Sequence, residues 1–348
     1  MKRIILSVFG VIVLALIPIL GVTASQEAPP LASPSDVIAT AADNYLNAPT
    51  TVWNMSEKDL CSNLLDRNPD NDPFILSIRA SDIYVLGHIP GAVNIPMAEV
   101  FKPENLARLP KDKKIVVYCY TGHTGSRVTA LLNLCGYDAT NLKWGMTGWT
   151  RDTEIAPSRF DPESAMDYPV ETTANTLTGS YSLPTIEDIA STSEAEIIRT
   201  ACYNYASGSH GDISATDLYA LITDGEPAND PIIVSVRSAE QYAKGHIPGA
   251  VNIALTDIAK KENLQMLDPN KQIVVYCYTG RTGSQTTAIL NVLGYNAVNL
   301  HWGMTSWTKD TDVAPGGFNP DTSVDYPFET GAGEEVPAEP SDGGGACG

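Results

Sequence analysis

The sequence predicts an α/β fold that occurs twice in one chain of 348 residues. Short apolar, β-branched runs alternate with segments that have helical spacing. The two halves repeat each other, and in each half one apolar run ends in a cysteine followed by a glycine-rich loop. Strands that alternate with helices favour a parallel sheet covered by helices on both faces. We therefore predict two domains of the same architecture.

The repeat keeps a constant spacing. Residues 115–126 read IVVYCYTGHTGS and residues 273–284 read IVVYCYTGRTGS, so that Cys277 follows Cys119 by 158 residues. The same spacing relates Arg79 to Arg237 and one GHIPGAVNI stretch to the other. A spacing that does not drift indicates a duplicated domain with no net insertion between these positions.

The expected elements follow one another in the same order in both halves. Residues 73–79 and 231–237, and later 114–120 and 272–278, are short and apolar on both faces, as buried strands are. Residues 126–137 and 284–295 have helical spacing and close on Gly136 and Gly294. Residues 139–146 and 297–304 then supply a strand that ends at a Trp-Gly turn. The cysteines fall at the carboxyl ends of strands, where parallel sheets place catalytic groups.

These patterns divide the chain. We expect one domain over 31–170, a surface linker over 171–193, a second domain over 194–328 and a disordered, acidic, Gly/Pro-rich tail over 329–348. Residues 1–24 combine Lys2 and Arg3 with an apolar run and small residues at its end, as a signal peptide does, or an N-terminal anchor if it is not cleaved. We expect the protein outside the cytoplasm, as a secreted, periplasmic or cell-envelope protein, with membrane contact only through an uncleaved N-terminal segment.

Composition limits the partners. With 22 basic and 41 acidic residues the formal charge is −19, which disfavours binding to nucleic acid and anionic lipid. We expect no metal and no cofactor, because the five histidines and six cysteines never fall at ligand spacing. Cys61, Cys135 and Cys202 have no cysteine at the matching position of the other half, and we expect small buried fillers there. Cys347, in the tail, is expected to be an idle thiol.

The loops after the cysteines carry the expected chemistry. Their glycines allow backbone N–H groups to curl towards the sulfur, and the start of the following helix adds its positive dipole end. A thiolate is stabilised in such a cradle and becomes a nucleophile. We therefore predict Cys119 and Cys277 as catalytic residues. The predicted binding residues for an anionic substrate are Tyr120, Thr121, Gly122, His123, Thr124 and Gly125, and Tyr278, Thr279, Gly280, Arg281, Thr282 and Gly283.

Three motifs resemble rhodanese domains, in the same order in both halves: Arg79 or Arg237, the GHIPGA stretch, and the strand-cysteine-loop-helix. The resemblance implies a five-stranded parallel sheet and sulfurtransferase chemistry. The cysteine takes the outer sulfur of a donor such as thiosulfate or polysulfide, becomes a persulfide and passes that sulfur to a thiol or cyanide. The implied partners are thus small sulfur donors and thiol acceptors. Ser77 and Ser235 stand where the family usually has Asp, and the loops lack its thiosulfate and mercaptopyruvate motifs, so the resemblance does not identify the donor.

The two loops differ at one position, His123 against Arg281. A permanent cation holds an oxyanion better than a histidine that is mostly neutral at pH 7. We expect the second half to be the better thiosulfate site, and the first to gain activity when His123 becomes charged near pH 6.

The same residues also allow other interpretations of function. A phosphatase needs an arginine six residues after the cysteine, where Gly125 and Gly283 stand, so that reading is rejected. A non-catalytic pair of rhodanese modules that bind sulfur or protein in the cell envelope stays open, as does thiol–disulfide exchange with Cys347 as the resolving thiol. Among the remaining polar and aromatic residues, we expect His88 and His246 to brace a turn. Arg79 and Arg237 are expected to be structural, and the tryptophans to line the core or a pocket.

Overall fold

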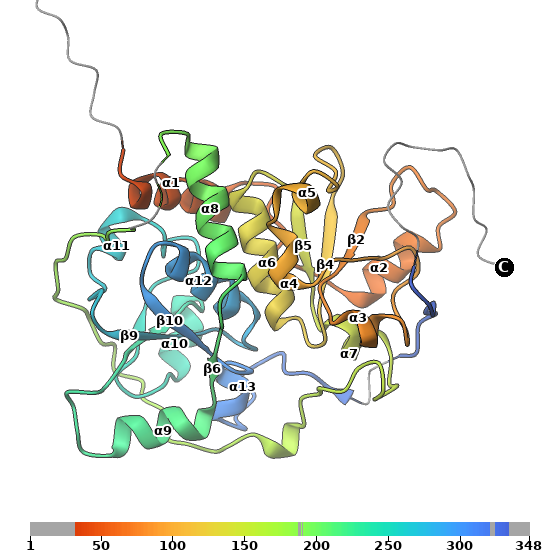
Figure 1. The fold of residues 1–348 in the computed structure, drawn as a ribbon. Helices are drawn as coiled ribbons and strands as arrows, with labels where there is room; N and C mark the ends of the chain where they lie inside the picture. The colour runs from red at the N-terminus through yellow and green to blue at the C-terminus, as the bar shows by residue number, and fades with distance from the viewer. Residues whose placement is uncertain (1–31, 187–188, 190, 321–323, 334–348) are drawn as a thin grey trace, which may run out of the picture. The chain divides into compact units, whose positions relative to one another are not determined.

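Two parallel sheets of five strands each form the framework of the protein (Figure 1). The computed structural model describes residues 32–186, 189, 191–320 and 324–333. The strand orders are β1-β5-β4-β2-β3 and β6-β10-β9-β7-β8, so the second sheet repeats the first strand for strand. The predicted fold class is confirmed: each half is a parallel α/β unit. The predicted signal peptide, 1–24, and Cys347 lie outside the described residues.

The strands of the first sheet are β1 (Asn54–Met55), β2 (Phe74–Ser77), β3 (Val93–Asn94), β4 (Ile115–Tyr118) and β5 (Ala139–Leu142); those of the second are β6 (Asp212–Ile213), β7 (Ile232–Ser235), β8 (Val251–Asn252), β9 (Gln272–Tyr276) and β10 (Asn296–Leu300). The helices of the first half are α1 (Pro34–Asn47), α2 (Glu57–Leu64), α3 (Ser81–Tyr84), α4 (Met97–Val100), α5 (Pro103–Leu106), α6 (His123–Leu134), α7 (Gly145–Trp149) and the 3₁₀ helix η1 (Pro162–Ser164). Those of the second half are α8 (Glu194–Ala206), α9 (Ala215–Thr223), α10 (Ala239–Lys244), α11 (Lys261–Leu264), α12 (Arg281–Val292) and α13 (Met304–Trp307).

The central strand of each sheet explains where the cysteines lie. All four residues of β4 are buried, as are the last four of β9, because helices cover both faces of the sheet. Cys119 directly follows β4 and Cys277 directly follows β9. The helices α6 and α12 begin three residues earlier than the sequence predicted, at His123 and Arg281.

The first helix of each half packs against the other half. Tyr45 of α1 donates a hydrogen bond to Gln285 of α12 at 3.0 Å, and Cys202 of α8 donates to the carbonyl of Leu131 of α6 at 3.8 Å. The helices α1 and α8 also contact each other and lie side by side in Figure 1. One continuous hydrophobic core contains buried residues of α1, α6, α8 and α12.

The last segment of each half packs against the other half. Tyr168 donates its backbone N–H to the carbonyl of Trp307, and the indole of Trp307 donates to the carbonyl of Pro169 at 2.9 Å. The matching segment reaches the first half: Tyr326 bonds to Trp149, and Glu329 pairs with His88. The segments 167–171 and 325–329, called the crossing arms below, therefore cover the half to which they do not belong by sequence.

This arrangement changes the expected boundaries. The end of the predicted first domain and the start of the predicted linker lie on the second half, where Asn175 forms a bridge to Val251 and Leu177 packs against the core. The first residues of the predicted tail are also bonded: Gly331 donates to the carbonyl of Val85 at 2.8 Å. The remainder of that tail, 334–348, is outside the described residues. No helix within the described ranges is long and apolar enough to cross a membrane.

Candidate active site

Each cysteine sits at the bottom of its loop in the same geometry. The side chain of Cys119 is 4% exposed and that of Cys277 is 2% exposed. The backbone N–H of Gly122 donates a hydrogen bond to the Cys119 sulfur at 3.1 Å, and that of Gly280 donates to the Cys277 sulfur at 3.1 Å. In both halves the donor is the N-cap residue of a 12-residue helix, whose N-terminus carries the positive end of the helix dipole. Each sulfur thus accepts a backbone hydrogen bond at the start of the helix that follows its strand.

The loop geometry requires the two N-cap glycines. Gly122 and Gly280 both have φ = +86°, in the left-handed region. A Cβ atom on Gly122 would collide with the carbonyl of Lys143, and one on Gly280 would lie 2.5 Å from Nε2 of His123. The contact between Gly280 and His123 is informative, because His123 belongs to the loop of the other half.

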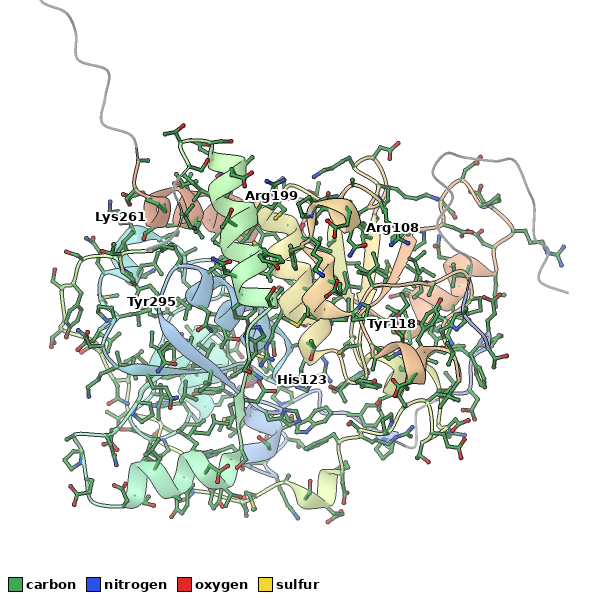
Figure 2. The ribbon with its side chains drawn as sticks, viewed as in Figure 1. Arg108, Tyr118, His123, Arg199, Lys261 and Tyr295 are labelled. Carbon is green, nitrogen blue, oxygen red and sulfur yellow. The ribbon has the colours of Figure 1, made fainter. Side chains whose placement is uncertain are left out.

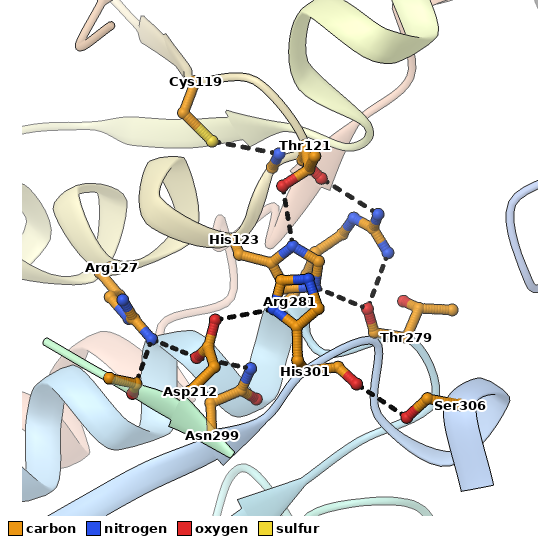
Figure 3. Close-up of polar contacts among 12 residues, drawn as sticks. Cys119, Thr121, His123, Arg127, Asp212, Thr279, Arg281, Asn299, His301 and Ser306 are labelled. Atoms are coloured by element: carbon orange, nitrogen blue, oxygen red, sulfur yellow. Dashed lines mark hydrogen bonds and ion pairs between the residues drawn. The ribbon is translucent and has the colours of Figure 1, made fainter. Parts of the chain in front are cut away.

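The two loops face each other, and their variable side chains meet between them (Figure 3). Nε2 of His123 lies 3.2 Å from the carbonyl oxygen of Thr279. Arg281 donates from Nη2 to the carbonyl of Thr121 at 3.1 Å and from Nη1 to the carbonyl of Thr279 at 2.9 Å. A third hydrogen bond runs from Nε of Arg281 to the carbonyl of Lys143. One guanidinium thus holds the backbone of both loops.

Arg281 is also the shared cation of the two sites. Its guanidinium carbon lies 3.4 Å from the ring centroid of Trp144, and only 1% of the residue is exposed. Burial lowers the pKa of Arg281 to about 9, and the Cys277 thiol, the Glu57 carboxyl and the Cys119 thiol each oppose that shift. The guanidinium therefore interacts with groups of both loops.

His123 is held as a neutral ring. It is 2% exposed and stacks on His301, with ring centroids 4.7 Å apart. Nδ1 of His123 lies 2.9 Å from the hydroxyl of Thr121. Burial, followed by the charge of Arg281, lowers the pKa of His123 well below its ordinary value.

This placement contradicts the expectation that His123 and Arg281 stand beside a bound sulfonate in separate sites. The polar atoms of both side chains bond to the backbone and side chains of the two loops. Burial and the charge of Arg281 lower the pKa of His123, which opposes the expected activation of the first half near pH 6.

A second polar pair joins the halves next to this contact. Arg127 of α6 forms an ion pair with Asp212 of β6, and both side chains are largely buried. Asp212 also accepts from Asn299 at 3.2 Å and lies 2.9 Å from Nδ1 of His301. The hydrogen bond from His301 and the charge of Arg127 lower the pKa of Asp212 to about 2, although burial opposes them.

Three pairs of matching positions in the repeat carry different residues near the contact between the halves. Arg281 matches His123, and Arg127 matches Gln285, which donates instead to the carbonyl of Trp53 at 3.1 Å. Asp212 matches Asn54, which accepts from Asn141. Arg281, Arg127 and Asp212 are charged, whereas their counterparts in the repeat, His123, Gln285 and Asn54, carry no permanent charge. Sequence comparison shows these differences but not that the positions touch.

The other predicted loop residues have two kinds of environment. Thr121, Gly122, Gly125, Thr279, Gly280 and Gly283 are buried, whereas Tyr120, Thr124, Tyr278 and Thr282 are half-buried. The hydroxyl of Tyr278 lies 3.3 Å from Ser238, and the ring of Tyr120 lies 5.9 Å from the guanidinium of Arg79. The tyrosine and the second threonine of each loop are thus the side chains that a small molecule could reach.

The arginines and histidines with an expected structural role bond to the protein's own backbone. Arg79 donates to the carbonyls of Ile155 and Gly87, and Arg237 makes the matching bonds to Val313 and Gly245. Arg237 also reaches Ser235 at 3.3 Å, whereas Nε of Arg79 has no partner. His88 and His246 stack on tyrosines one helical turn earlier and bond to their carbonyls. Trp149 and Trp307 are core residues.

The remaining cysteines differ from one another. Cys61 and Cys202 are buried, as expected, but Cys135 is only half-buried and lies next to Cys202, since both residues bond to the carbonyl of Leu131. No pattern in the sequence relates these two cysteines, because their positions do not match in the repeat. Among the residues that the structure describes, no group of three His, Cys, Asp or Glu side chains could hold a metal ion.

Comparison with known proteins identifies the repeat. The family model of the rhodanese-like domain matches residues 58–152 and 214–310, together more than half of the chain. A putative sulfurtransferase of Bacillus subtilis, YtwF, is 34% identical over 100 residues, which are 29% of this chain and 95% of that protein. The thiosulfate sulfurtransferase PspE of Escherichia coli is 35% identical over 71 residues, covering 20% of this chain and 68% of PspE.

A third relative is matched over less of its length. The chain spans 43% of the putative sulfur carrier protein YrkF of Bacillus subtilis, with 36% identity over 81 residues, or 23% of this chain. Among solved structures, SSP1007 of Staphylococcus saprophyticus is 31% identical, with a TM-score of 0.26, over 28% of this chain and 94% of that one. A thiosulfate sulfurtransferase of Pseudomonas aeruginosa is 16% identical, with a TM-score of 0.28, over 87% of this chain and 49% of that one.

Proposed function

We propose that this chain, which belongs to the rhodanese family and carries the rhodanese-like domain twice, moves a sulfane sulfur from a small donor to an acceptor through persulfides on Cys119 and Cys277. Its relatives support a sulfurtransferase at the level of the family. Thiosulfate and polysulfide are the proposed donors, and a thiol or cyanide is the proposed acceptor.

The first half-reaction makes the persulfide. The thiolate of Cys119 or Cys277 attacks the outer sulfur of thiosulfate, the S–S bond of the donor breaks, and sulfite leaves with the bonding electrons. The N–H groups at the start of α6 or α12 stabilise the anion on either side of the transfer, since both the thiolate and the persulfide are negative. Arg281 contributes a positive charge to both sites.

The second half-reaction restores the enzyme. A thiolate or cyanide attacks the outer sulfur of the persulfide, the S–S bond breaks, and the cysteine leaves as a thiolate. The half-buried residues Tyr120, Thr124, Tyr278 and Thr282 are the proposed contacts for the donor and acceptor. We further propose that this chemistry takes place outside the cytoplasm; the basic residues and apolar run within residues 1–24 support this location.

One observation carries the proposal: in each half the N–H of the matching glycine donates to the cysteine sulfur at 3.1 Å. A buried structural thiol has no need of a left-handed glycine N-cap directed at its sulfur. Two such sites with the same geometry favour retained chemistry over retained packing.

Intact mass spectrometry tests the proposal. Full-length protein incubated with thiosulfate or polysulfide should gain up to two sulfur atoms, and cyanide should remove them as thiocyanate. Cys119→Ser and Cys277→Ser should each lose one addition, and the double variant should lose both. Cys61→Ser, which alters a buried cysteine outside the loops, is the matched control and should behave as the unaltered chain does.

Two outcomes would contradict the assignment. Sulfur that still adds to the double variant would place the chemistry on other cysteines. Absence of any addition, together with slow alkylation of both loop cysteines at mildly acidic pH, would favour the alternative of a non-catalytic rhodanese module.

A further inference from the structure

Cys135 and Cys202 bring one thiol from each half to the same place. Cys135 is the C-cap of α6, and Cys202 lies in α8. The backbone N–H of Cys135 and the sulfur of Cys202 both donate to the carbonyl of Leu131, at 3.1 Å and 3.8 Å, which places the two cysteines next to each other. Two thiols that lie next to each other need little movement to become a disulfide.

The surroundings of the two thiols are unequal. Cys202 is fully buried, whereas Cys135 is half-buried and lines a pocket of about 600 Å³ between α5, α6 and α8. Lys111 and Arg199 line the same pocket, and the ammonium of Lys111 donates to the carbonyl of Cys135 at 3.2 Å. Arg199 projects from α8 (Figure 2) and is paired with Glu196. A small reactant can therefore reach Cys135, beside two basic side chains, but not Cys202.

We propose that Cys135 and Cys202 form a reversible disulfide between the two halves, made by exchange with a small disulfide that enters the pocket beside Cys135. The Cys135 thiolate attacks one sulfur of the small disulfide, whose S–S bond breaks and releases one small thiolate. Cys202 then gives up its proton to solvent and attacks the Cys135 sulfur, which expels the second thiolate. The protein loses two electrons and two protons, and one small disulfide becomes two small thiols.

The buried thiol acts second. Burial and the neighbouring Cys135 raise the pKa of Cys202 well above its ordinary value, so it is a poor nucleophile towards anything in solution. Contact with Cys135 removes the need for diffusion, which makes Cys202 suited to resolve a mixed disulfide that has already formed. The same thiol, exposed to solvent, would itself be a site of adduct formation.

The bond would tie α8 to the end of α6 that lies farthest from the cysteine loop. Since Cys119 precedes α6 and Cys135 follows it, the disulfide leaves the active loop in place and instead fixes how the halves are held together. This role is separate from sulfur transfer, and it does not require Cys119 or Cys277.

Exchange with glutathione tests the proposal. The full chain carrying Cys119→Ser, Cys277→Ser and Cys347→Ser keeps Cys61, Cys135 and Cys202 as its thiols. After native incubation with glutathione disulfide it should lose two hydrogen atoms in intact mass and give a non-reduced peptide that joins Cys135 to Cys202. The urea midpoint of unfolding should rise, and dithiothreitol should reverse both changes.

Single variants in that background show the order of the steps. With Cys202→Ser, one glutathione should remain on Cys135, because nothing resolves it. With Cys135→Ser, Cys202 should stay unmodified, and Cys61→Ser should behave as the background does. Absence of the joined peptide from the background chain would overturn the proposal whatever the single variants show, and so would a joined chain whose urea midpoint is lower.

Discussion

The variant His123→Arg distinguishes what the structure predicts from what the sequence pattern predicts. From the sequence, His123→Arg should improve the first site by giving it the residue of the second. In the structure, the new guanidinium would enter the buried space already occupied by that of Arg281, where His123 now meets the carbonyl of Thr279. We expect the variant to be destabilised and its activity to fall with its stability.

The magnitude follows from charge and hydrogen bonding. Two unit charges roughly 5–6 Å apart repel by about 3 kcal/mol at an effective dielectric constant of about 20. Loss of the contact between His123 and Thr279 adds about 1 kcal/mol. The free energy of unfolding should thus fall by about 3–5 kcal/mol, a range also typical of an uncompensated buried charge.

Urea unfolding of four chains provides the assay: the unaltered protein, His123→Arg, Arg281→His and the exchanged pair His123→Arg with Arg281→His. The exchanged pair again has a single cation between the loops, so it should recover most of the stability that His123→Arg loses. A His123→Arg chain as stable as the unaltered one would refute the reasoning, as would an exchanged pair no more stable than the single variant.

Three further predictions follow from the same geometry. Burial lowers the pKa values of His123, His88 and His210, so the unfolded chain binds more protons than the folded chain below about pH 6.5. The free energy of unfolding should therefore fall as pH drops from 7 to 5.5, and His123→Leu should make that fall less steep. An unchanged pH dependence of His123→Leu in urea titrations would contradict this. Asp212→Asn should lower the free energy of unfolding by about 3–5 kcal/mol by leaving Arg127 buried and unpaired, whereas Asp36→Asn, which breaks an exposed pair with Lys261, should cost at most about 1 kcal/mol. Equal effects of the two on unfolding would count against a buried pair between the halves. Gly122→Ala should abolish persulfide formation on Cys119, because the added Cβ collides with the carbonyl of Lys143. Gly91→Ala, at φ = +70° in open space, should lower the free energy of unfolding by only about 1–2 kcal/mol and leave the sulfur addition seen by mass spectrometry unchanged.

The sequence was a good guide to what is local. The strands 114–120 and 272–278 could be found because they are short, apolar and repeated, and the position of each cysteine followed from them. The start of α6 at His123 was missed, because the loop reads as turn residues up to Ser126 while the backbone already coils after Gly122. The second threonine of each loop therefore lies in the first helical turn.

The contacts between the halves could not be predicted in this way. A duplicated pattern looks the same whether α1 covers its own half or the other, because the apolar face of the helix is the same in both cases. The repeat also aligns His123 with Arg281 but does not say that the two meet, and it hides Cys135 and Cys202, which lie next to each other although they do not match. These facts depend on how the halves associate.

The crossing arms have a consequence for what counts as one folding unit. Each half takes its final covering, and its first helix, from beyond its own sequence boundary. A fragment cut at the linker would expose the bare indole of Trp149 or Trp307 and the apolar sides of α6 or α12 to water. The rhodanese-like domain, as matched along the sequence, is thus not a separable module in this chain. By their packing the two halves resemble the subunits of a dimer whose chains have been joined end to end, and we expect them to fold only together.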